Sequence, residues 1–258
     1  MRRMLPILGI ALLALLAAGA ALLMLAPAEL AYRVAGHRLA PTTLEGVSGS
    51  VWDGRAAQWV AHGVALGPVE WRVERAAALA ARPRGELRVT GRQVSGKALF
   101  ERTADGWSLS AIDGSFPAPL LAPALDIPGL GLLGTIELDL TSVVIRDGQI
   151  ATAAGRIAWR GLGVRGIAAL MLPGVEMQIE STGERSLAAT IADLGGPLAV
   201  DGRLRLADGA FSAEVDLVPR EDEPRLEEIL KFVGERRPDG GSHLRIEGTL
   251  KPMLGEQP

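Results

Sequence analysis

Two hydrophobic patterns divide the chain. Residues 5–26 form an uninterrupted run of Ala, Leu, Ile, Met and Gly with one proline near its start, whereas from about residue 40 apolar and polar residues alternate. A helix over the first run would be roughly 33 Å long, enough to cross a hydrocarbon core of about 30 Å. Alternation with a period of two is typical of strands that bury one face. The pattern therefore predicts a single N-terminal transmembrane helix followed by a mainly β domain.

The charges beside the apolar run set its expected orientation. Arg2 and Arg3 precede it, so the positive-inside rule keeps residues 1–4 in the cytoplasm and exports everything that follows. We expect a linker over residues 27–40 and an exported β domain over residues 41–258, which the family resemblance described below places in the periplasm. A cleaved secretory signal is the alternative, since small residues flank the end of the run, but a cleavable apolar region usually spans about 7–15 residues.

The sequence clearly predicts one β-hairpin. Residues 198–206 and 211–217 each alternate apolar with polar positions, and Asp208-Gly209 lies between them. Asp-Gly is a strong signal for a two-residue turn whose central residues both need positive φ. Similar pairs recur at residues 53–54, 105–106, 113–114, 147–148 and 239–240. Short strands about ten residues apart, joined by tight turns, predict an antiparallel meander rather than parallel crossover units.

Three segments interrupt the alternation. Residues 117–131 contain four prolines and predict an irregular connection, and the alanine-rich residues 76–81 predict one or two helical turns. Residues 222–235 have the spacing of an amphipathic helix, with Leu226, Ile229 and Leu230 on its apolar side. Such a helix covers a sheet edge or one end of the core; the alternative is that its apolar side contacts a partner. The fold expected is mainly β, with one or two short helices.

Composition and motifs narrow the chemistry. The 30 acidic and 27 basic residues give a net charge of −3 without a block of one sign, which disfavours nucleic acid as a partner. The chain has no cysteine, and its three histidines lie far apart without metal-binding spacing. A G-x-G-x-x-G match at residues 161–166 lacks the long helix that a dinucleotide site requires and predicts a glycine-rich bulge or loop instead. We therefore expect no catalytic residue, cofactor or metal ion, and no enzymatic activity.

The five tryptophans stand out against one tyrosine and four phenylalanines. Tryptophan on a strand buries a large area, so we expect most of them in the core. The alternative is that one or two line an open concave face that contacts lipid or protein. The positions are Trp52, Trp59, Trp71, Trp107 and Trp159.

A short glycine and tryptophan pattern carries a family resemblance. Residues 46–54 read Gly-Val-Ser-Gly-Ser-Val-Trp-Asp-Gly, residues 66–71 read Leu-Gly-Pro-Val-Glu-Trp, and residues 155–159 repeat Gly-x-Ile-x-Trp. The pattern resembles that of type II secretion system protein N. The positions that carry the resemblance are Gly46, Gly49, Trp52, Gly54, Gly67, Trp71, Gly155 and Trp159.

The resemblance implies a function that the residue patterns alone do not. Members of this family are accessory inner-membrane proteins of Gram-negative bacteria that support export of folded proteins from the periplasm across the outer membrane. It implies a curved antiparallel sheet similar to AsmA-type periplasmic domains, with the inner-membrane bilayer and other secretion components as partners and no catalytic residues. We expect a membrane-tethered structural subunit; the alternative is a lipid-binding or lipid-transfer protein with an apolar groove.

Overall fold

The protein is a single antiparallel sheet. The computed structural model describes residues 26–39, 42–61, 63–121, 131–146, 149–165, 170–171, 173–220, 226, 230 and 234–249. Within them sixteen strands pair in the order β1-β3-β4-β5-β6-β7-β8-β9-β11-β12-β13-β14-β16-β15, while β2 pairs with β3 and β10 with β9. Nearly every strand therefore lies beside its neighbour in the sequence, which confirms the predicted meander.

The strands are longest in the middle of the sheet. The N-terminal ones are β1 (Thr42–Glu45), β2 (Ser48–Gly49), β3 (Asp53–Ala61), β4 (Val64–Val73), β5 (Arg84–Thr90), β6 (Ser95–Arg102) and β7 (Gly106–Pro117). The others are β8 (Gly131–Arg146), β9 (Gln149–Arg165), β10 (Leu170–Met171), β11 (Gly174–Gly183), β12 (Ser186–Asp193), β13 (Leu198–Ala207), β14 (Ala210–Pro219), β15 (Glu235–Arg236) and β16 (Ser242–Thr249). Short helices are α2 (Ala28–Ala35), α3 (Arg75–Leu79) and the 3-10 turns η1 (Gly36–Leu39) and η2 (Ala118–Leu121).

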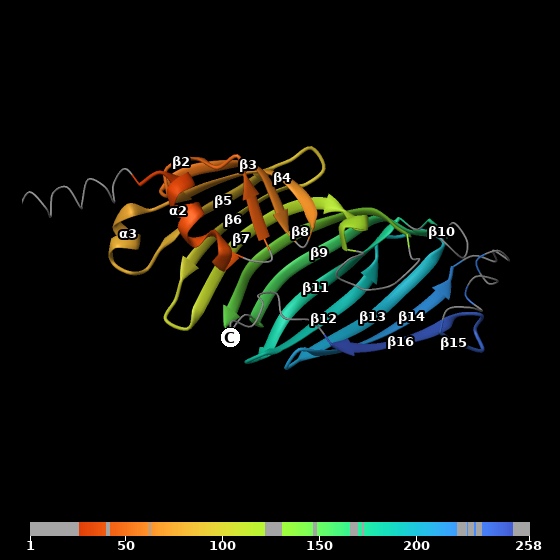
Figure 1. Ribbon diagram of the computed structural model, residues 1–258. Coiled ribbons are helices and arrows are strands. Elements are labelled where there is room, and N and C mark those ends of the chain that lie inside the picture. The colour runs from red at the N-terminus through yellow and green to blue at the C-terminus, as the bar shows by residue number, and fades with distance from the viewer. Residues whose placement is uncertain are drawn as a thin grey trace, which may run out of the picture.

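The sheet is strongly curved. In Figure 1 the orange strands β3 and β4 stand above the blue strands β14 and β16, and the green strands β8 and β9 join the two halves. The pairing registers slip within β3–β4, β6–β7, β8–β9 and β11–β12. Because each bulge bends its strand and increases the local twist, these slips supply the curvature.

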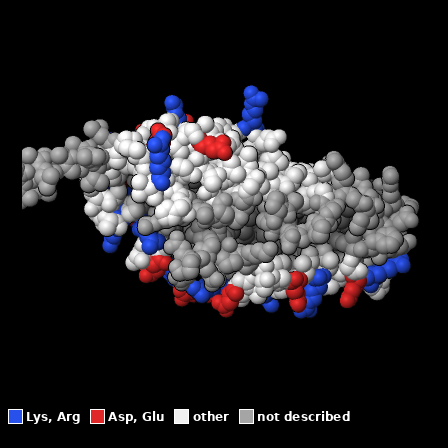
Figure 2. Space-filling view, in the orientation of Figure 1, with Lys and Arg blue, Asp and Glu red and all other residues white. Residues whose placement is uncertain are grey.

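The two faces of the sheet differ in chemistry. Side chains such as Leu109, Val143 and Leu206 gather on one face in clusters that run from β7 to β14. Charged side chains occupy the alternate positions, and Figure 2 shows them along the outer border of the molecule. We call these the apolar face, on the inside of the bend, and the charged face, on the outside.

No second layer covers most of the apolar face in the part of the chain that the structure describes. Among these residues the largest side chain less than 2% exposed is that of Ser242, and the buried core consists of alanines and a similar number of leucines, valines and isoleucines, with no aromatic residue. All five tryptophans are half-buried. The prediction that most tryptophans lie in a closed core is therefore wrong, because a sheet without a facing layer leaves large side chains partly exposed.

One exception to the open face lies near the C-terminal end. Leu226 and Leu230 are helical and only 3% exposed, and they pack with Leu198 and Val200 of β13. The amphipathic segment predicted over residues 222–235 thus covers the apolar face at these two positions. Partner contact through Leu226 and Leu230 is not supported, since the sheet already buries them; Ile229 lies outside the described residues.

The N-terminal connection is more ordered than expected. Residues 27–40 were predicted as a linker, but α2 and η1 occupy most of it. The hydroxyl of Tyr32 accepts a hydrogen bond from the backbone N–H of Leu44 in β1 at 2.8 Å, which fixes α2 to the sheet. Of the predicted anchor only Ala26 is described, and no helix within the described residues is long and apolar enough to span a bilayer.

The turn predictions have mixed outcomes. Asp208 and Gly209 both have positive φ, 48° and 80°, and join β13 to β14 as expected. Asp113-Gly114, by contrast, lies inside β7. Residues 147–148 and most of the connection over residues 117–131 lie outside the described residues. The G-x-G-x-x-G match begins in β9 opposite a register slip in β8, which confirms a glycine-rich bulge.

Candidate functional site

Six of the eight residues that carry the family resemblance lie on or beside β2, β3 and β4. We call this region the N-terminal corner. Its members are Gly46 after β1, Gly49 at the end of β2, Trp52 in the β2–β3 turn, Gly54 in β3, and Gly67 and Trp71 in β4. Gly155 and Trp159 belong to β9, five strand steps away, which corresponds to roughly 24 Å along the sheet.

A serine organises the turn of the corner. The Ser50 hydroxyl oxygen accepts hydrogen bonds from the backbone N–H groups of Trp52 and Asp53 at 3.3 and 3.0 Å. The Ser50 N–H donates to the Asp53 carbonyl at 2.9 Å, closing the turn. The reversal therefore falls at residues 51–52, just before the Asp-Gly pair that the sequence suggested. A hydroxyl so placed serves as a local cap for backbone donors.

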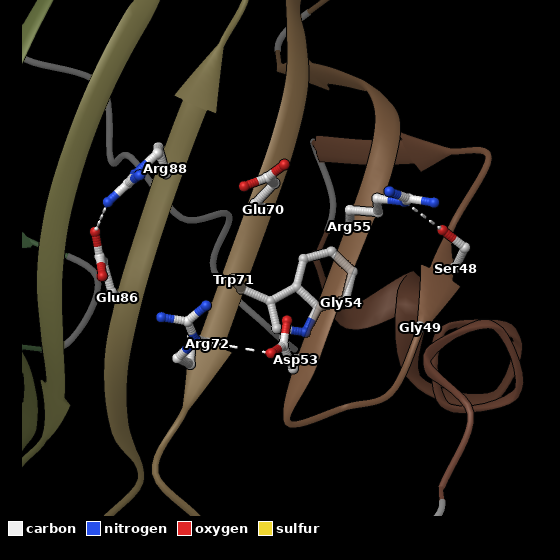
Figure 3. Close-up of a pocket in the computed structure, with 10 residues that line it drawn as sticks. All are labelled: Ser48, Gly49, Asp53, Gly54, Arg55, Glu70, Trp71, Arg72, Glu86 and Arg88. Carbon is white, nitrogen blue, oxygen red and sulfur yellow. Dashed lines mark hydrogen bonds and ion pairs between the residues drawn. The ribbon is translucent and has the colours of Figure 1, made fainter.

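The tryptophan of β4 explains the glycine of β3. Gly54 and Trp71 are paired across the two strands, and Figure 3 shows the indole lying against Gly54. A Cβ atom at Gly54 would lie 2.4 Å from the Trp71 ring and 2.6 Å from the Ser50 carbonyl oxygen. Only glycine leaves room for both, so the Gly54–Trp71 contact locks the turn onto β4.

The N-terminal corner also makes backbone contacts with the residues that precede α2. The N–H of Val51 donates to the carbonyl of Ala26 at 3.1 Å, and Pro27 forms an antiparallel bridge with Ser50. The last residue of the apolar run is thus bonded to the turn that carries Trp52. The glycine and tryptophan pattern consequently builds the junction between the predicted anchor and the sheet.

The second half of the pattern stabilises the middle of the sheet. Trp159 donates its indole N–H to the carbonyl of Leu133 at 2.8 Å, spanning the register slip between β8 and β9. It packs there with Leu132 and Ile136. The repeated sequence therefore has different contacts on the two strands: Trp71 fills the space beside Gly54, whereas Trp159 bridges a register slip.

The charged face carries a hollow of about 360 Å³ over the N-terminal corner. Each of three neighbouring strands presents an acid-x-Arg pair, and pairing places acid opposite base in two rows (Figure 3). The rows are Asp53–Arg72–Glu86 and Arg55–Glu70–Arg88.

The charges of this hollow neutralise one another. The Arg88 guanidinium donates a hydrogen bond to the Glu86 carboxylate at 2.6 Å. This bond lowers the pKa of Glu86 and raises the pKa of Arg88. Arg72 lies 3.7 Å from Asp53, and Arg55 donates to the Ser48 hydroxyl at 3.3 Å. Three acids and three bases leave no net charge, so the surface favours a partner with a matching mixed pattern over a simple ion.

A second ion cluster lies on the same face around the small side chain of Ala158. Arg160 pairs with Glu137 at 2.6 Å, and Arg156 contacts Asp139 at 3.1 Å and Glu176 at 3.6 Å. Among the described residues, no three His, Asp or Glu side chains lie together as metal ligands would. The charged face thus presents fixed, paired charges from the N-terminal half to the centre of the sheet.

Sequence reasoning missed the charged hollow, although a signal for it exists. Asp53-x-Arg55, Glu70-x-Arg72 and Glu86-x-Arg88 repeat at intervals that match one hairpin. On antiparallel neighbours such repeats produce alternating rows of opposite charge. Their alignment depends on the register, which the bulge in β3 shifts and the sequence does not disclose.

These features first define the class of fold to which the protein belongs. Within the described residues, the protein is a curved, single-layer antiparallel β domain with one apolar face and one ion-paired face. The family model of type II secretion system protein N matches residues 40–245, so the chain belongs to that family. The match contains the N-terminal corner and all the strands except the end of β16. No curated protein and no solved structure matches the chain.

Family membership supports an accessory role in type II secretion and implies interaction with other components of that system.

Proposed function

We propose that this protein is a single-pass inner-membrane subunit that holds a periplasmic β scaffold beside other components of the type II secretion system. The family match supports the secretion role. The apolar run at residues 5–26, preceded by Arg2 and Arg3, supports the anchor and its orientation. The scaffold works by position: the anchor fixes where the sheet lies, and the sheet presents surfaces to partner domains.

The difference between the two sheet edges carries the proposal. At the N-terminal edge β1 also has a strand on one side only, but the Tyr32 hydroxyl accepts the Leu44 N–H and Pro27 forms a bridge with Ser50 beside β2. At the other edge, β15 pairs with only Ser242 and His243 of β16. Within the described residues, Leu244 to Thr249 therefore have a strand partner on one side alone. An edge of this kind accepts an added strand from another protein.

Site-specific photocrosslinking in secreting cells tests this role. A photoreactive side chain at Glu247, on the open edge, is expected to capture another inner-membrane subunit of the secretion system. The matched position is Arg205 of β13, which is equally exposed on the charged face but has strands on both sides. Capture at neither position, together with normal secretion in cells lacking the protein, contradicts the proposal.

A second function is favoured by the open apolar face. Half-exposed side chains such as Ile112, Leu140 and Ile179 line it without a covering layer among the described residues. We propose as an alternative an AsmA-like role, in which this face holds the acyl chains of a lipid. Burial of apolar surface supplies the affinity at about 25 cal/mol per Å².

Neighbouring residues of β11 give a direct comparison for the lipid alternative. Ile179 is on the apolar face and Gln178 is exposed on the charged face. A photoreactive group at position 179 should acquire the mass of a phospholipid in cells, whereas the same group at position 178 should not. Equal labelling at both positions, or none at 179, contradicts a lipid groove while leaving the scaffold role intact.

A further inference from the structure

The most exposed large apolar side chains lie on the two short helices. Val34 is 77% exposed, Leu79 65% and Leu30 56%, ahead of Leu99 and Ile246 elsewhere in the described residues. Leu30 and Val34 belong to α2 and Leu79 to α3. An exposed leucine by itself is ordinary, but a group on adjoining elements indicates a contact surface.

Helix α2 turns its larger apolar side chains away from the protein. Ala28 is buried, and Tyr32, one turn later, bonds to β1, so these two residues define the inward side. Leu30 and Val34 are also four residues apart, and a helix places them on roughly the opposite side. In an isolated soluble domain the stripe of large apolar residues normally faces inward. Here the docked geometry holds it outward.

Backbone hydrogen bonds place α2 and α3 at the same end of the sheet. Val51 donates to Ala26 just before α2, and Val73, just before α3, donates to the carbonyl of Trp52 at 2.6 Å. The starts of the two helices are therefore separated only by the turn at residues 51–52, a distance of about two strand spacings. Figure 1 shows α2 and α3 at the same end of the sheet.

We propose that this end of the molecule rests on the surface of the bilayer, with Leu30, Val34 and Leu79 entering the interfacial region. This inference rests on the proposed anchor at residues 5–26, because the apolar run ends two residues before α2 and so delivers α2 to the membrane boundary. The exposed Arg82 lies three residues after Leu79 and suits anionic headgroups. Glu29 and Glu74 carry ion pairs with Arg33 and Arg84, which reduces their repulsion of such headgroups.

The contact would orient the scaffold as well as tether it. A single anchor followed by a free linker allows a domain to rotate, whereas two helices fixed to one sheet corner and seated on the bilayer restrict it. Trp52, half-buried in the turn between them, is a residue type enriched at membrane interfaces. The sheet would then extend from its N-terminal corner away from the membrane surface.

The absence of cysteine makes a depth measurement straightforward. Full-length variants Leu30→Cys, Val34→Cys and Leu79→Cys, each carrying a nitroxide label, would be reconstituted in vesicles of phosphatidylethanolamine and phosphatidylglycerol. Leu99→Cys and Ile246→Cys serve as matched controls because they are also exposed apolar positions. A Leu15→Cys label reports whether the anchor lies within the bilayer.

Collision with oxygen, which concentrates in lipid, is compared with collision with a water-soluble nickel chelate. Labels at positions 30, 34 and 79 are expected to give ratios between those of the two controls and that of position 15, as an interfacial depth requires, while labels at 99 and 246 favour nickel. If positions 30, 34 and 79 match the two controls while position 15 stays in lipid, the surface contact is refuted and the anchor stands. If position 15 is also in water, the proposed anchoring fails.

A charge variant separates membrane contact from mere proximity. Combining Leu30→Asp, Val34→Asp and Leu79→Asp should shift a label at the exposed Ala31 from the interfacial to the aqueous ratio without moving the label at position 15. The three side chains are exposed, so the far-UV circular dichroism and melting temperature should stay at the parent values. An unchanged label at position 31 in a folded variant would overturn the inference.

Discussion

The contact between Gly54 and Trp71 shows how single residues fix the N-terminal corner. The indole occupies the space where any side chain at position 54 would lie. In turn, the Ser50 carbonyl approaches from the other side, so the turn and β4 are held against one glycine. The loss of this fit is expected to loosen the junction with the N-terminal segment rather than to remove a reactive group.

Gly54→Ala should lower the free energy of unfolding by about 1–3 kcal/mol, the usual range for overpacking a close contact. Gly183→Ala is the matched control, because a Cβ atom there meets nothing closer than Ser186 at 3.8 Å. Urea denaturation of both variants measures the difference. Adding Trp71→Leu should recover only part of the loss, since the Ser50 carbonyl remains 2.6 Å from the new methyl group. Equal stability of the two alanine variants would contradict the packing argument.

Asp193 provides a pH-dependent link at the end of β12. Arg220 donates to its carboxylate at 2.9 Å, and the N–H groups of Val200 and Gly195 donate at 3.0 and 2.8 Å. These bonds lower the pKa of Asp193 to about 2. Because the unfolded carboxyl group has an ordinary, higher pKa, the stabilisation is complete above pH about 4 and is lost as the pH falls towards 2.

Asp193→Asn should therefore destabilise the protein by about 1–2 kcal/mol at pH 7. The difference from the parent protein should shrink from pH about 4 downward and vanish near pH 2. Asp208→Asn changes the net charge equally but keeps an Asn-Gly turn, and should have little effect at any pH. Thermal melts of the parent protein and the two variants across this pH range measure the stability differences. If the difference between the parent and Asp193→Asn persists below pH 2, the ionised carboxylate is not its source.

At the scale of elements, the segment around Leu226 and Leu230 closes one end of the apolar face. Both side chains pack against β13, so Leu226→Ala should cost about 2–4 kcal/mol of stability. Leu99→Ala, on the exposed face of β6, should cost less than about 0.5 kcal/mol. Denaturation and secretion assays together distinguish the roles. If the Leu226→Ala protein is fully stable but no longer supports secretion, Leu226 contacts a partner instead of packing against the sheet.

Strands were predictable where apolar and polar residues alternate without interruption. Residues 198–206 and 211–217 fall within β13 and β14, and the Asp208-Gly209 turn has the expected backbone angles. The segment over residues 27–40 was not predictable as a docked helix, because the hydroxyl of Tyr32 meets β1 only in the folded chain. Likewise, Asp113-Gly114 has the composition of a turn, but pairing with β6 and β8 extends it as strand.

The candidate site was foreseen in part. The glycine and tryptophan pattern identified the N-terminal corner, since close backbone packing needs glycine beside an indole. The charged hollow depends instead on the registers of β3, β4 and β5, and a one-residue slip would have moved its charges to the other face. The tryptophans were expected in the core because an indole buries a large area. Alternation shows that one face is apolar, but it does not show whether another layer covers that face.

At the scale of the whole molecule, most contacts of the sheet are between strands that are consecutive in the sequence. Each strand pairs with the next, and within the described residues few segments connect distant strands. Stability should then be a sum of local pairings, as in repeat proteins, instead of a single cooperative unit. The longest pair, β8 and β9 with 16 and 17 residues, lies at the centre, and the shortest strands lie at the edges.

Hydrogen exchange followed by mass spectrometry tests this arrangement on the full-length protein. Peptides from β8 and β9 should exchange most slowly, and those from β1 and β16 most rapidly, because an edge strand can separate by breaking one ladder. The Gly54→Ala variant sharpens the test, since the closest atoms that the added methyl group meets belong to Trp71 and the Ser50 carbonyl, both in the N-terminal corner. Its exchange should accelerate in β3, β4 and β5 but remain at the parent rate in β13 and β14. Uniform acceleration through the sheet would mean that the protein unfolds as one unit, and that a disturbance at the N-terminal corner reaches the open edge at β16.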